Sequence, residues 1–332
     1  MSSGLRIQAP AKINLGLALV GTRADGYHLL ESVFVPIAVF DAVTLQVESG
    51  PASIALDCGP ALDADLPKAV GLVPSGPDNL VWRAARLFCE RAGFVASIRI
   101  GLRKGIPAGA GLGGGSSDAA AVLRGLVALS GRAISPDELA AWALELGADV
   151  PFFLAPEPAF VSGIGEHIER IAGLPALAIV LVNPGKTLAT ADVYRTSDRL
   201  ASALTKNRSG STMRALSGLT QNVRDTVPAL RDLLINDLEP AARQLCPVVG
   251  RISDRLERVG ALAVSMTGSG ATVFGVFDSE AAANDAAKRL RAEEAGVPGE
   301  SERCWVRATR VLAHGAGPVG GFEEFLGASP NG

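Results

Sequence analysis

The chain has 332 residues, of which 48% are hydrophobic and 20% are charged, and its formal net charge is −3. This content is sufficient for a large core, and the length lies between one large domain and two ordinary ones. A charge so close to zero excludes the broad basic surface of a nucleic-acid-binding protein. Residues 1–12 carry no apolar run of signal-peptide length, and no stretch approaches the roughly 20 apolar residues that span a bilayer. We therefore expect a cytoplasmic protein that binds neither nucleic acid nor membrane.

The predicted elements follow the hydrophobic periodicity. Alternating apolar residues predict a strand over 5–20 that breaks at Pro10 and places Lys12 and Asn14 on one face. Further strands are predicted at 32–40, 41–47, 97–102, 177–182, 261–267, 271–277 and 304–312, and helices at 80–91, 119–129, 136–146, 239–246, 248–259 and 279–295.

Strands and helices mix without a strict strand–helix alternation. This pattern predicts an α+β fold in two domains, 1–173 and 174–314. Residues 48–78 are rich in Pro, Gly, Ala and Asp and indicate a surface excursion, and the Gly-rich segment 315–332 indicates a flexible tail. Four cysteines without a CxxC pair argue against a zinc site or a disulfide framework.

The strongest local feature is the sequence PAGAGLGGGSSD at residues 107–118. Five glycines lie in the seven positions 109–115, and the loop opens directly into a predicted helix. Glycines without Cβ atoms let a ligand approach the backbone amides, and the positive end of the helix dipole favours a polyphosphate. The candidate phosphate-binding residues are Pro107, Ala108, Gly109, Ala110, Gly111, Leu112, Gly113, Gly114, Gly115, Ser116 and Ser117.

Three other interpretations of this loop are weaker. It satisfies GxGxxG, but a dinucleotide fold would place that motif in an early βαβ unit. A Walker A loop would need a lysine before the serine, where Gly115 stands. A flexible surface loop is the remaining alternative, and the high glycine density leading into a helix disfavours it.

Three motifs together resemble the GHMP kinases. The loop resembles their second motif, residues 10–15 (PAKINL) resemble the first, and residues 266–271 (MTGSGA) resemble the third. The triple glycine before Ser-Ser is the form seen in the diphosphocytidyl-methylerythritol kinases of this family. The resemblance covers residues 6–312 and implies an N-terminal domain similar to ribosomal protein S5 domain 2, followed by a ferredoxin-like domain.

A catalytic pair follows from the resemblance. Asp149 in GADVPFF matches the family's catalytic aspartate, which would accept the proton of the attacking hydroxyl. Lys12 would keep that carboxylate ionised and offset charge on the phosphoryl group. From the residues alone, Asp149 reads as a turn residue at a helix end and Lys12 as a solvated strand lysine.

Substrate contacts are implied in the same way. RADGYH at residues 23–28 and Phe34 resemble a cytidine pocket, in which Tyr27 would stack on the base and His28 would bind its edge. Without the resemblance, both would be packing or buried polar residues. The remaining candidates are Tyr194 on the opposite face of the base, Asn14 on the erythritol part, Thr267, Gly268, Ser269 and Gly270 beside the phosphates, and Lys104 and Asn79 near the adenine. Asn236 is expected to cap a helix.

The resemblance thus implies transfer of the γ-phosphate of ATP to the 2-hydroxyl of 4-diphosphocytidyl-2-C-methyl-D-erythritol. Mg²⁺ would be bound by the phosphates without an assigned direct protein ligand, with the hydroxyl of Ser116 or Ser117 able to reach the phosphate-bound ion, in a monomer or weak homodimer. The alternatives are a sister GHMP kinase such as homoserine kinase, a nucleotide-binding regulator without catalysis, and a NAD-dependent oxidoreductase. A sister kinase would not need the cytidine contacts, and a regulator would not need Lys12 and Asp149.

Overall fold

A computed structural model describes residues 3–63, 65–66, 73–172, 174–201, 234–296, 303–312 and 322–326. In this part of the chain the strands form a seven-stranded sheet, with β11-β1-β2-β4-β3 in order and β5 and β6 joined to β2, and a four-stranded sheet in the order β10-β7-β9-β8. The strands are β1 (Ser3–Thr22), β2 (His28–Glu48), β3 (Ser53–Cys58), β4 (Ser97–Arg103), β5 (Ala159–Gly163), β6 (His167–Arg170), β7 (Ala178–Asn183), β8 (Ala263–Met266), β9 (Val273–Phe277), β10 (Trp305–Arg310) and β11 (Phe322–Leu326).

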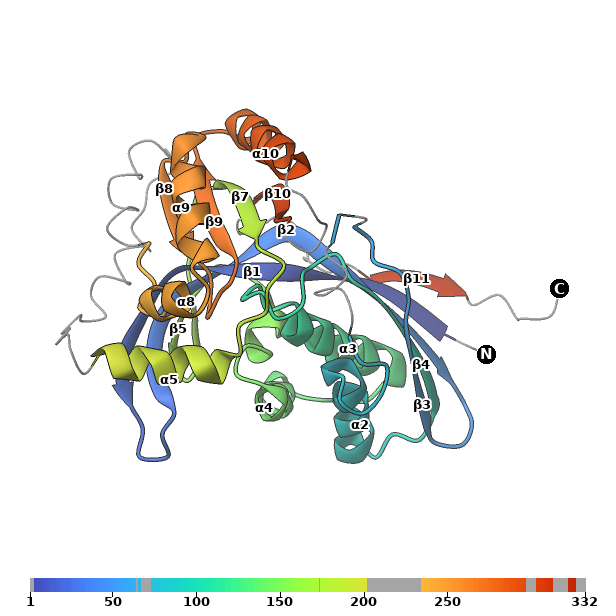
Figure 1. Cartoon of the computed structure of the whole chain (residues 1–332). Helices are drawn as coiled ribbons and strands as arrows, with labels where there is room; N and C mark the ends of the chain where they lie inside the picture. Colours follow the sequence, from blue (N-terminus) through green and yellow to red (C-terminus); the bar gives the residue numbers. More distant parts are fainter. Residues whose placement is uncertain are drawn as a thin grey trace.

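The helices lie on both sheets. Figure 1 shows α2, α3 and α4 on one face of the larger sheet and α9 and α10 beside the smaller one. The helices are α2 (Leu80–Ala92), α3 (Gly114–Ser130), α4 (Pro136–Leu146), the short 3₁₀ helix η1 (Pro151–Leu154), α5 (Thr190–Ala201), α8 (Glu239–Leu245), α9 (Val248–Arg258) and α10 (Glu280–Ala295). The arrangement confirms the predicted α+β class, because the strand pairs are antiparallel except for β3 with β4. No helix in these ranges is long and apolar enough to cross a bilayer.

The antiparallel pair β1–β2 is the longest strand pair in the described part of the chain and lies at the centre of the larger sheet. It runs from Ser3 opposite Val47 to Thr22 opposite His28. The predicted break at Pro10 is wrong, because β1 continues through this residue with a register shift between Pro10 and Ala11. A bulge accommodates a proline, which has no N–H to donate to the ladder. The two strands predicted at 32–40 and 41–47 form one bent strand, β2, which runs through the same register shift without ending.

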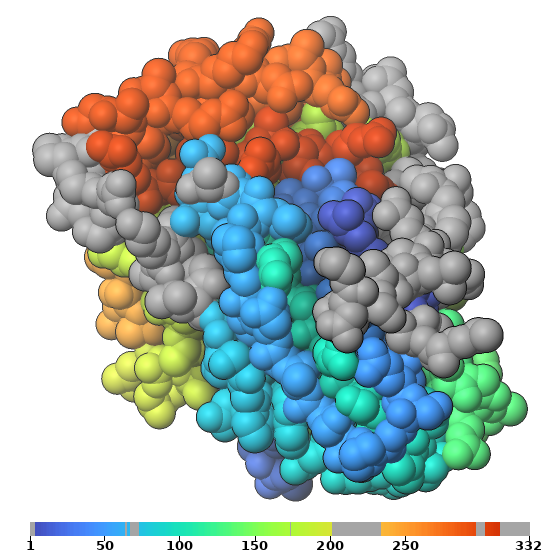
Figure 2. All heavy atoms as spheres, turned by 90° about the vertical axis from the view of Figure 1, so that its right-hand side faces the viewer, coloured from blue at the N-terminus to red at the C-terminus, as the bar shows by residue number. Residues whose placement is uncertain are grey.

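Apolar side chains form three clusters. The first lies between the larger sheet and α2–α4, and the third lies between the smaller sheet, α8, α9 and α10. The middle cluster joins the two sheets and contains Ile13, Val35, Leu181, Phe274 and Trp305. Figure 2 shows the C-terminal half, in orange and red, seated on the N-terminal half, in blue to green. The predicted boundary residue, Gly173, lies outside the described residues, so the division into 1–173 and 174–314 stays a prediction.

Helix ends follow the capping signals. Ser135 and Glu138 form the predicted capping box of α4, and Gly93 ends α2 in the left-handed region (φ 56°). Helix α3 begins at Gly114 rather than near residue 119. The low helix propensity of glycine conceals this first turn in the sequence.

Two segments differ from their predictions. The excursion contains β3, which pairs in parallel with β4. Farther along, Asp63 accepts a hydrogen bond from Trp305 Nε1 (2.8 Å) and pairs with Arg307, so it contacts the C-terminal half. The tail expected to be flexible contains β11, paired with β1, and that prediction is therefore wrong for Phe322–Leu326. The other residues of 313–332 lie outside the described part of the chain.

Candidate active site

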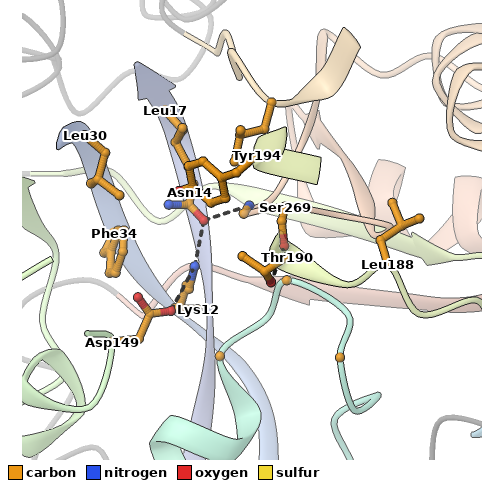
Figure 3. A pocket seen from close by; sticks show the side chains of 15 residues that line it. Lys12, Asn14, Leu17, Leu30, Phe34, Asp149, Leu188, Thr190, Tyr194 and Ser269 are labelled. Carbon is orange, nitrogen blue, oxygen red and sulfur yellow. Dashed lines mark hydrogen bonds and ion pairs between the residues drawn. The ribbon is translucent and has the colours of Figure 1, made fainter. Parts of the chain in front are cut away.

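A cavity of about 210 Å³ lies where the two halves meet. Its walls come from β1, β2, the glycine loop, the turn after α4, the start of α5 and the turn between β8 and β9 (Figure 3). The lining residues are Lys12, Asn14, Leu17, Leu30, Phe34, Gly109, Gly111, Gly113, Asp149, Leu188, Thr190, Tyr194, Leu238, Gly268 and Ser269. The three motifs and Asp149, which are far apart in the sequence, therefore meet at one site.

Three glycines shape the loop at this cavity. Gly109, Gly111 and Gly113 have φ values of 62°, 78° and 70°, which side-chain-bearing residues rarely adopt. A Cβ on Gly111 would lie 2.3 Å from the carbonyl oxygen of Thr267. Thr267 Oγ1 also lies 3.2 Å from Gly111 O, as a donor to it. The second and third motifs therefore pack directly against each other.

The helix that follows the loop has an open amino-terminal end. Its N-cap residue, Gly113, provides no side-chain cap for the amides of the first turn. Gly115 is exposed, and a Cβ added there would meet no atom within 4 Å. Protein packing therefore does not require this glycine, and the helix amides beside it are open to the approach of an anion.

Lys12 and Asp149 lie side by side, as Figure 3 shows. Lys12 Nζ is 3.5 Å from Asp149 Oδ2 and 4.5 Å from the centre of the Phe34 ring. The lysine is only 3% exposed, whereas the aspartate side chain is 33% exposed. Asp149 stands in a turn between α4 and η1, anchored by the buried Phe152 and Phe153. A buried cation thus lies beside a carboxylate that an incoming molecule can reach.

Asn14 holds the lysine in place. Its Oδ1 accepts hydrogen bonds from Lys12 Nζ (2.7 Å) and from Gly268 N (2.9 Å). Its Nδ2 donates to Ser32 Oγ (2.8 Å), and Ser32 Oγ donates to Gly16 O (2.5 Å). The predicted erythritol contact of Asn14 is thereby weakened, because its amide is 1% exposed and already bonded on both sides. Ser32 has no signal in the sequence, since its role depends on the pairing of β1 with β2.

The third motif is fixed by buried polar contacts. Thr267 Oγ1 accepts from Asn14 N (3.1 Å), and Asn236 Nδ2 donates to both Met266 O and Gly268 O at 2.8 Å. The assigned N-cap of α8 is Leu238, but Asn236 Oδ1 accepts from Leu238 N (2.9 Å), so Asn236 bonds a backbone amide at the start of the helix as predicted. Within the motif, Gly268 and Ser269 line the cavity, and Thr267 and Gly270 support them from behind.

The aromatic candidates divide into two groups. Phe34 and Tyr194 line the cavity, and burial followed by the nearby Asp149 charge raises the pKa of Tyr194 to about 12. His28 lies against Tyr194 with ring centres 4.9 Å apart, and its Nε2 is 2.7 Å from Asp198 Oδ1. Tyr27 is 63% exposed and does not line the cavity. The structure therefore brings together Phe34, Tyr194 and His28 but leaves Tyr27 in solvent.

Two residues predicted near the adenine have other partners. Asn79 caps α2 by accepting from Val81 N (2.9 Å) and donates to Pro74 O (2.7 Å). Lys104 is buried between Asp41 and Asp118. Neither lines the cavity. We correct the prediction for Lys104, because its ammonium is fully engaged by two carboxylates.

Other residues of the loop serve packing. Ala110 and Leu112 belong to the middle cluster, and Ser117 Oγ is buried without a hydrogen-bond partner. Ser116 is half-buried at the first turn of α3. Pro107, Ala108, Gly114, Gly115, Ser116 and Ser117 adjoin the cavity wall without lining it. The sequence interpretation missed Leu17, Leu30, Leu188, Thr190 and Leu238, of which Thr190 bonds Ser269 (3.0 Å between the hydroxyl oxygens).

Comparison with known proteins identifies the family. The family model described as "GHMP kinases N terminal domain" matches residues 79–156, and "GHMP kinases C terminal" matches residues 202–295. The chain is 43% identical to the 4-diphosphocytidyl-2-C-methyl-D-erythritol kinase of Rhizobium leguminosarum bv. trifolii, over 87% of this chain and 91% of that one. It is 40% identical to the enzyme of the same name from Syntrophotalea carbinolica, over 85% of this chain and 92% of that one.

Comparison with solved structures gives the same fold. A crystal structure of 4-(cytidine 5'-diphospho)-2C-methyl-D-erythritol kinase superposes with a TM-score of 0.68 and 35% identity, covering 93% of this chain and 100% of the other. Homoserine kinase from Cytophaga hutchinsonii superposes with a TM-score of 0.64 at 19% identity, covering 93% of this chain and 95% of the other, and so shares the fold. With three motifs converging on one cavity and relatives matching along most of its length, the chain belongs to the GHMP kinase family, has its two-domain fold, and is a kinase with ATP as co-substrate.

Proposed function

We propose that this kinase transfers the γ-phosphate of ATP to the 2-hydroxyl of 4-diphosphocytidyl-2-C-methyl-D-erythritol, a step of isoprenoid precursor synthesis by the non-mevalonate route. The observation that carries the proposal is the Lys12–Asp149 pair, 3.5 Å apart, at the cavity that the glycine loop also lines. The names of the relatives at 43% and 40% identity support the choice of substrate.

The glycine loop binds the triphosphate. Gly109, Gly111 and Gly113 bring backbone close to the cavity, and the uncapped first turn of α3 presents amides and the positive end of its dipole. Because little covalent chemistry falls to the protein in phosphoryl transfer, this placement supplies most of the catalysis.

Asp149 activates the alcohol. Its partly exposed carboxylate accepts the hydroxyl proton as the oxygen attacks the γ-phosphorus, and the bond from that phosphorus to the β-phosphate oxygen breaks to release ADP. Lys12, held by Asn14 Oδ1 at 2.7 Å, stabilises the aspartate as an anion and offsets charge on the phosphoryl group. Its burial keeps water from screening that charge.

The residues present fit a phosphate-bound Mg²⁺ rather than a protein-bound one. Among the described residues, no group of three or more His, Cys, Asp and Glu could hold a metal ion. Ser116, half-buried at the helix start, is the hydroxyl that would approach the ion, since Ser117 Oγ is covered. When bound, the ion would neutralise charge on the β- and γ-phosphates.

The base lies at the aromatic end of the cavity. Tyr194 supplies one face for stacking, and His28 a hydrogen bond to the base edge. Tyr27, which is 63% exposed and outside the cavity lining, moves onto the other face when the base binds. Phe34 packs beside Lys12. Asp198, next to His28, orients that ring.

A coupled assay of ADP release tests the substrate. The acceptors are the diphosphocytidyl alcohol, the same methylerythritol phosphate without the cytidine, homoserine and mevalonate. We expect turnover with the first alone. Turnover with homoserine or mevalonate and none with the cytidine compound would replace this proposal with a sister activity of the family.

A further inference from the structure

A buried cluster of three charged residues lies behind the glycine loop, outside the cavity lining. Asp41 on β2, Lys104 just after β4 and Asp118, four residues into α3, meet with almost no exposed side-chain surface. Lys104 Nζ donates to Asp118 Oδ2 at 2.7 Å and makes a second close contact with Asp41 Oδ2. Burying three such groups is costly unless each has a partner, so their placement needs a reason.

The cluster grips both ends of the loop. Asp41 Oδ1 accepts from Gly105 N (2.6 Å) and Ile106 N (2.9 Å), the last two residues before the loop begins at 107. Asp118 lies on α3, just after the helix turn into which the loop opens. Gly114 lies so close that a Cβ there would be 3.2 Å from Asp41 Oδ2.

The glycines let a ligand approach the backbone of this loop closely, but they also give that backbone conformational freedom. Its amides can bind phosphate without a large entropic cost only if the structure around the loop already holds them in place. We propose that Asp41, Lys104 and Asp118 are positioning residues that fix the entry and the exit of the glycine loop, and so hold its amides ready for the phosphates of ATP. This inference rests on the proposed role of the loop, not on the identity of the alcohol.

The charge balance of the cluster is consistent with that role. Burial, and secondarily the Asp41 charge, raises the pKa of Asp118 to about 8. Asp118 therefore keeps a proton more readily than an exposed carboxyl does, which lessens the negative charge of the cluster. A second anion here would repel phosphates at the start of α3. The titratable groups facing Asp118 are Asp41 on β2, Lys104 and, at the end of β3, Cys58.

Four variants of the full chain test the proposal. Asp41→Asn and Lys104→Met each break the cluster, whereas Asp118→Asn keeps a neutral acceptor for Lys104. The control is Glu294→Gln, which weakens a comparable buried pair between α9 and α10, where Glu294 Oε1 lies 2.5 Å from Arg255 Nη1. The measurements are the dissociation constant of ADP by calorimetry, the KM values for ATP and for the alcohol, and the melting temperature.

We expect Asp41→Asn and Lys104→Met to weaken ADP binding and raise the KM for ATP about 10-fold, the effect of one lost buried hydrogen bond to a charged group. The KM for the alcohol should not change. Asp118→Asn, which keeps an oxygen acceptor for Lys104, should weaken ADP binding less than these two variants do, and Glu294→Gln should lower the melting temperature without affecting ADP. Unchanged ADP affinity in both disruptive variants would overturn the inference, and either variant suffices if the other does not fold.

A second readout follows from the titration of Asp118. The native state keeps a proton that the unfolded chain releases near the ordinary pKa of 3.8, so wild-type stability should fall as pH rises from that value towards 8. The amide of Asp118→Asn does not titrate. The melting temperature of this variant should therefore rise relative to that of the wild type as the pH increases over the same range. A constant difference would show that Asp118 is ionised in the native protein. Wild-type protein that binds ADP but does not phosphorylate the cytidine alcohol would refute the proposed substrate and leave the positioning role intact.

Discussion

The two ends of the cavity are built differently. At the transfer end, Lys12, Asn14 and Thr267 are buried and joined by hydrogen bonds to Ser32 and Gly268. At the aromatic end, Tyr27 stands in solvent, and His28 is paired with the exposed Asp198. The difference indicates that the groups proposed to act in catalysis are in place before substrate arrives, whereas the groups proposed to bind the base come together around it. Substitutions at the transfer end should therefore lower kcat, and substitutions at the aromatic end should raise the KM for the cytidine substrate.

The largest effect is expected at Asp149. Replacing it by Asn removes the proton acceptor but keeps its shape, and should lower kcat by about 10²–10⁴-fold, the usual contribution of a general base. The KM for ATP should stay the same. Asp285→Asn, on the exposed face of α10, is the matched control. Steady-state kinetics measure both, and undiminished turnover in Asp149→Asn would remove this residue from the mechanism.

Ser32 tests whether the transfer end is held in place as described. Ser32→Ala removes the acceptor that orients the Asn14 amide, so Oδ1 would no longer be directed at Lys12. Losing one buried hydrogen bond predicts a fall in kcat of about 10-fold. Ser32→Thr keeps the hydroxyl and should restore kcat. If Ser32→Ala lowers the melting temperature alone, Ser32 supports the fold and not the lysine.

The sequence predicted the residues of the transfer end better than it predicted the residues that hold them in place. Lys12, Asp149 and the glycine loop lie in short motifs, where local spacing carries the information. Ser32, and the contacts of Asn236 with the third motif, could not be found in that way, since they depend on strand pairing and on residues 18 and 30 positions away. Lys104 was assigned to ATP because a motif position does not reveal that two distant carboxylates bury it. The strands β3 and β11 were not predicted, because each is stabilised by pairing with a neighbouring strand.

Two tyrosines at the aromatic end provide a direct test of whether the base-binding groups assemble around the substrate. Tyr194→Ala and Tyr27→Ala should each raise the KM for the cytidine substrate about 10-fold, the value of one stacked base, with kcat unchanged. Tyr194 already lines the cavity, whereas Tyr27 must move to reach the base. An effect of Tyr194→Ala alone would mean that one ring suffices and that Tyr27 is not a substrate contact.

Asp198 should have the smallest effect. Its carboxylate is exposed, so its pairing with His28 contributes at most about 1 kcal/mol, or a rise in KM of about 5-fold in Asp198→Asn. The KM for ATP serves as the internal reference. A larger rise, or a fall in kcat, would place Asp198 closer to the reacting groups than the structure does.

The uninterrupted pair β1–β2 has a consequence for the whole protein. Side chains of these strands enter the cluster under α3 as well as the one that contacts β7, β9 and β10. Dividing the gene near codon 173 would therefore produce an N-terminal fragment with an uncovered apolar surface and a C-terminal fragment that lacks the surface on which it packs. Co-expression of the two pieces could rebuild the enzyme, but neither should accumulate as a folded product by itself.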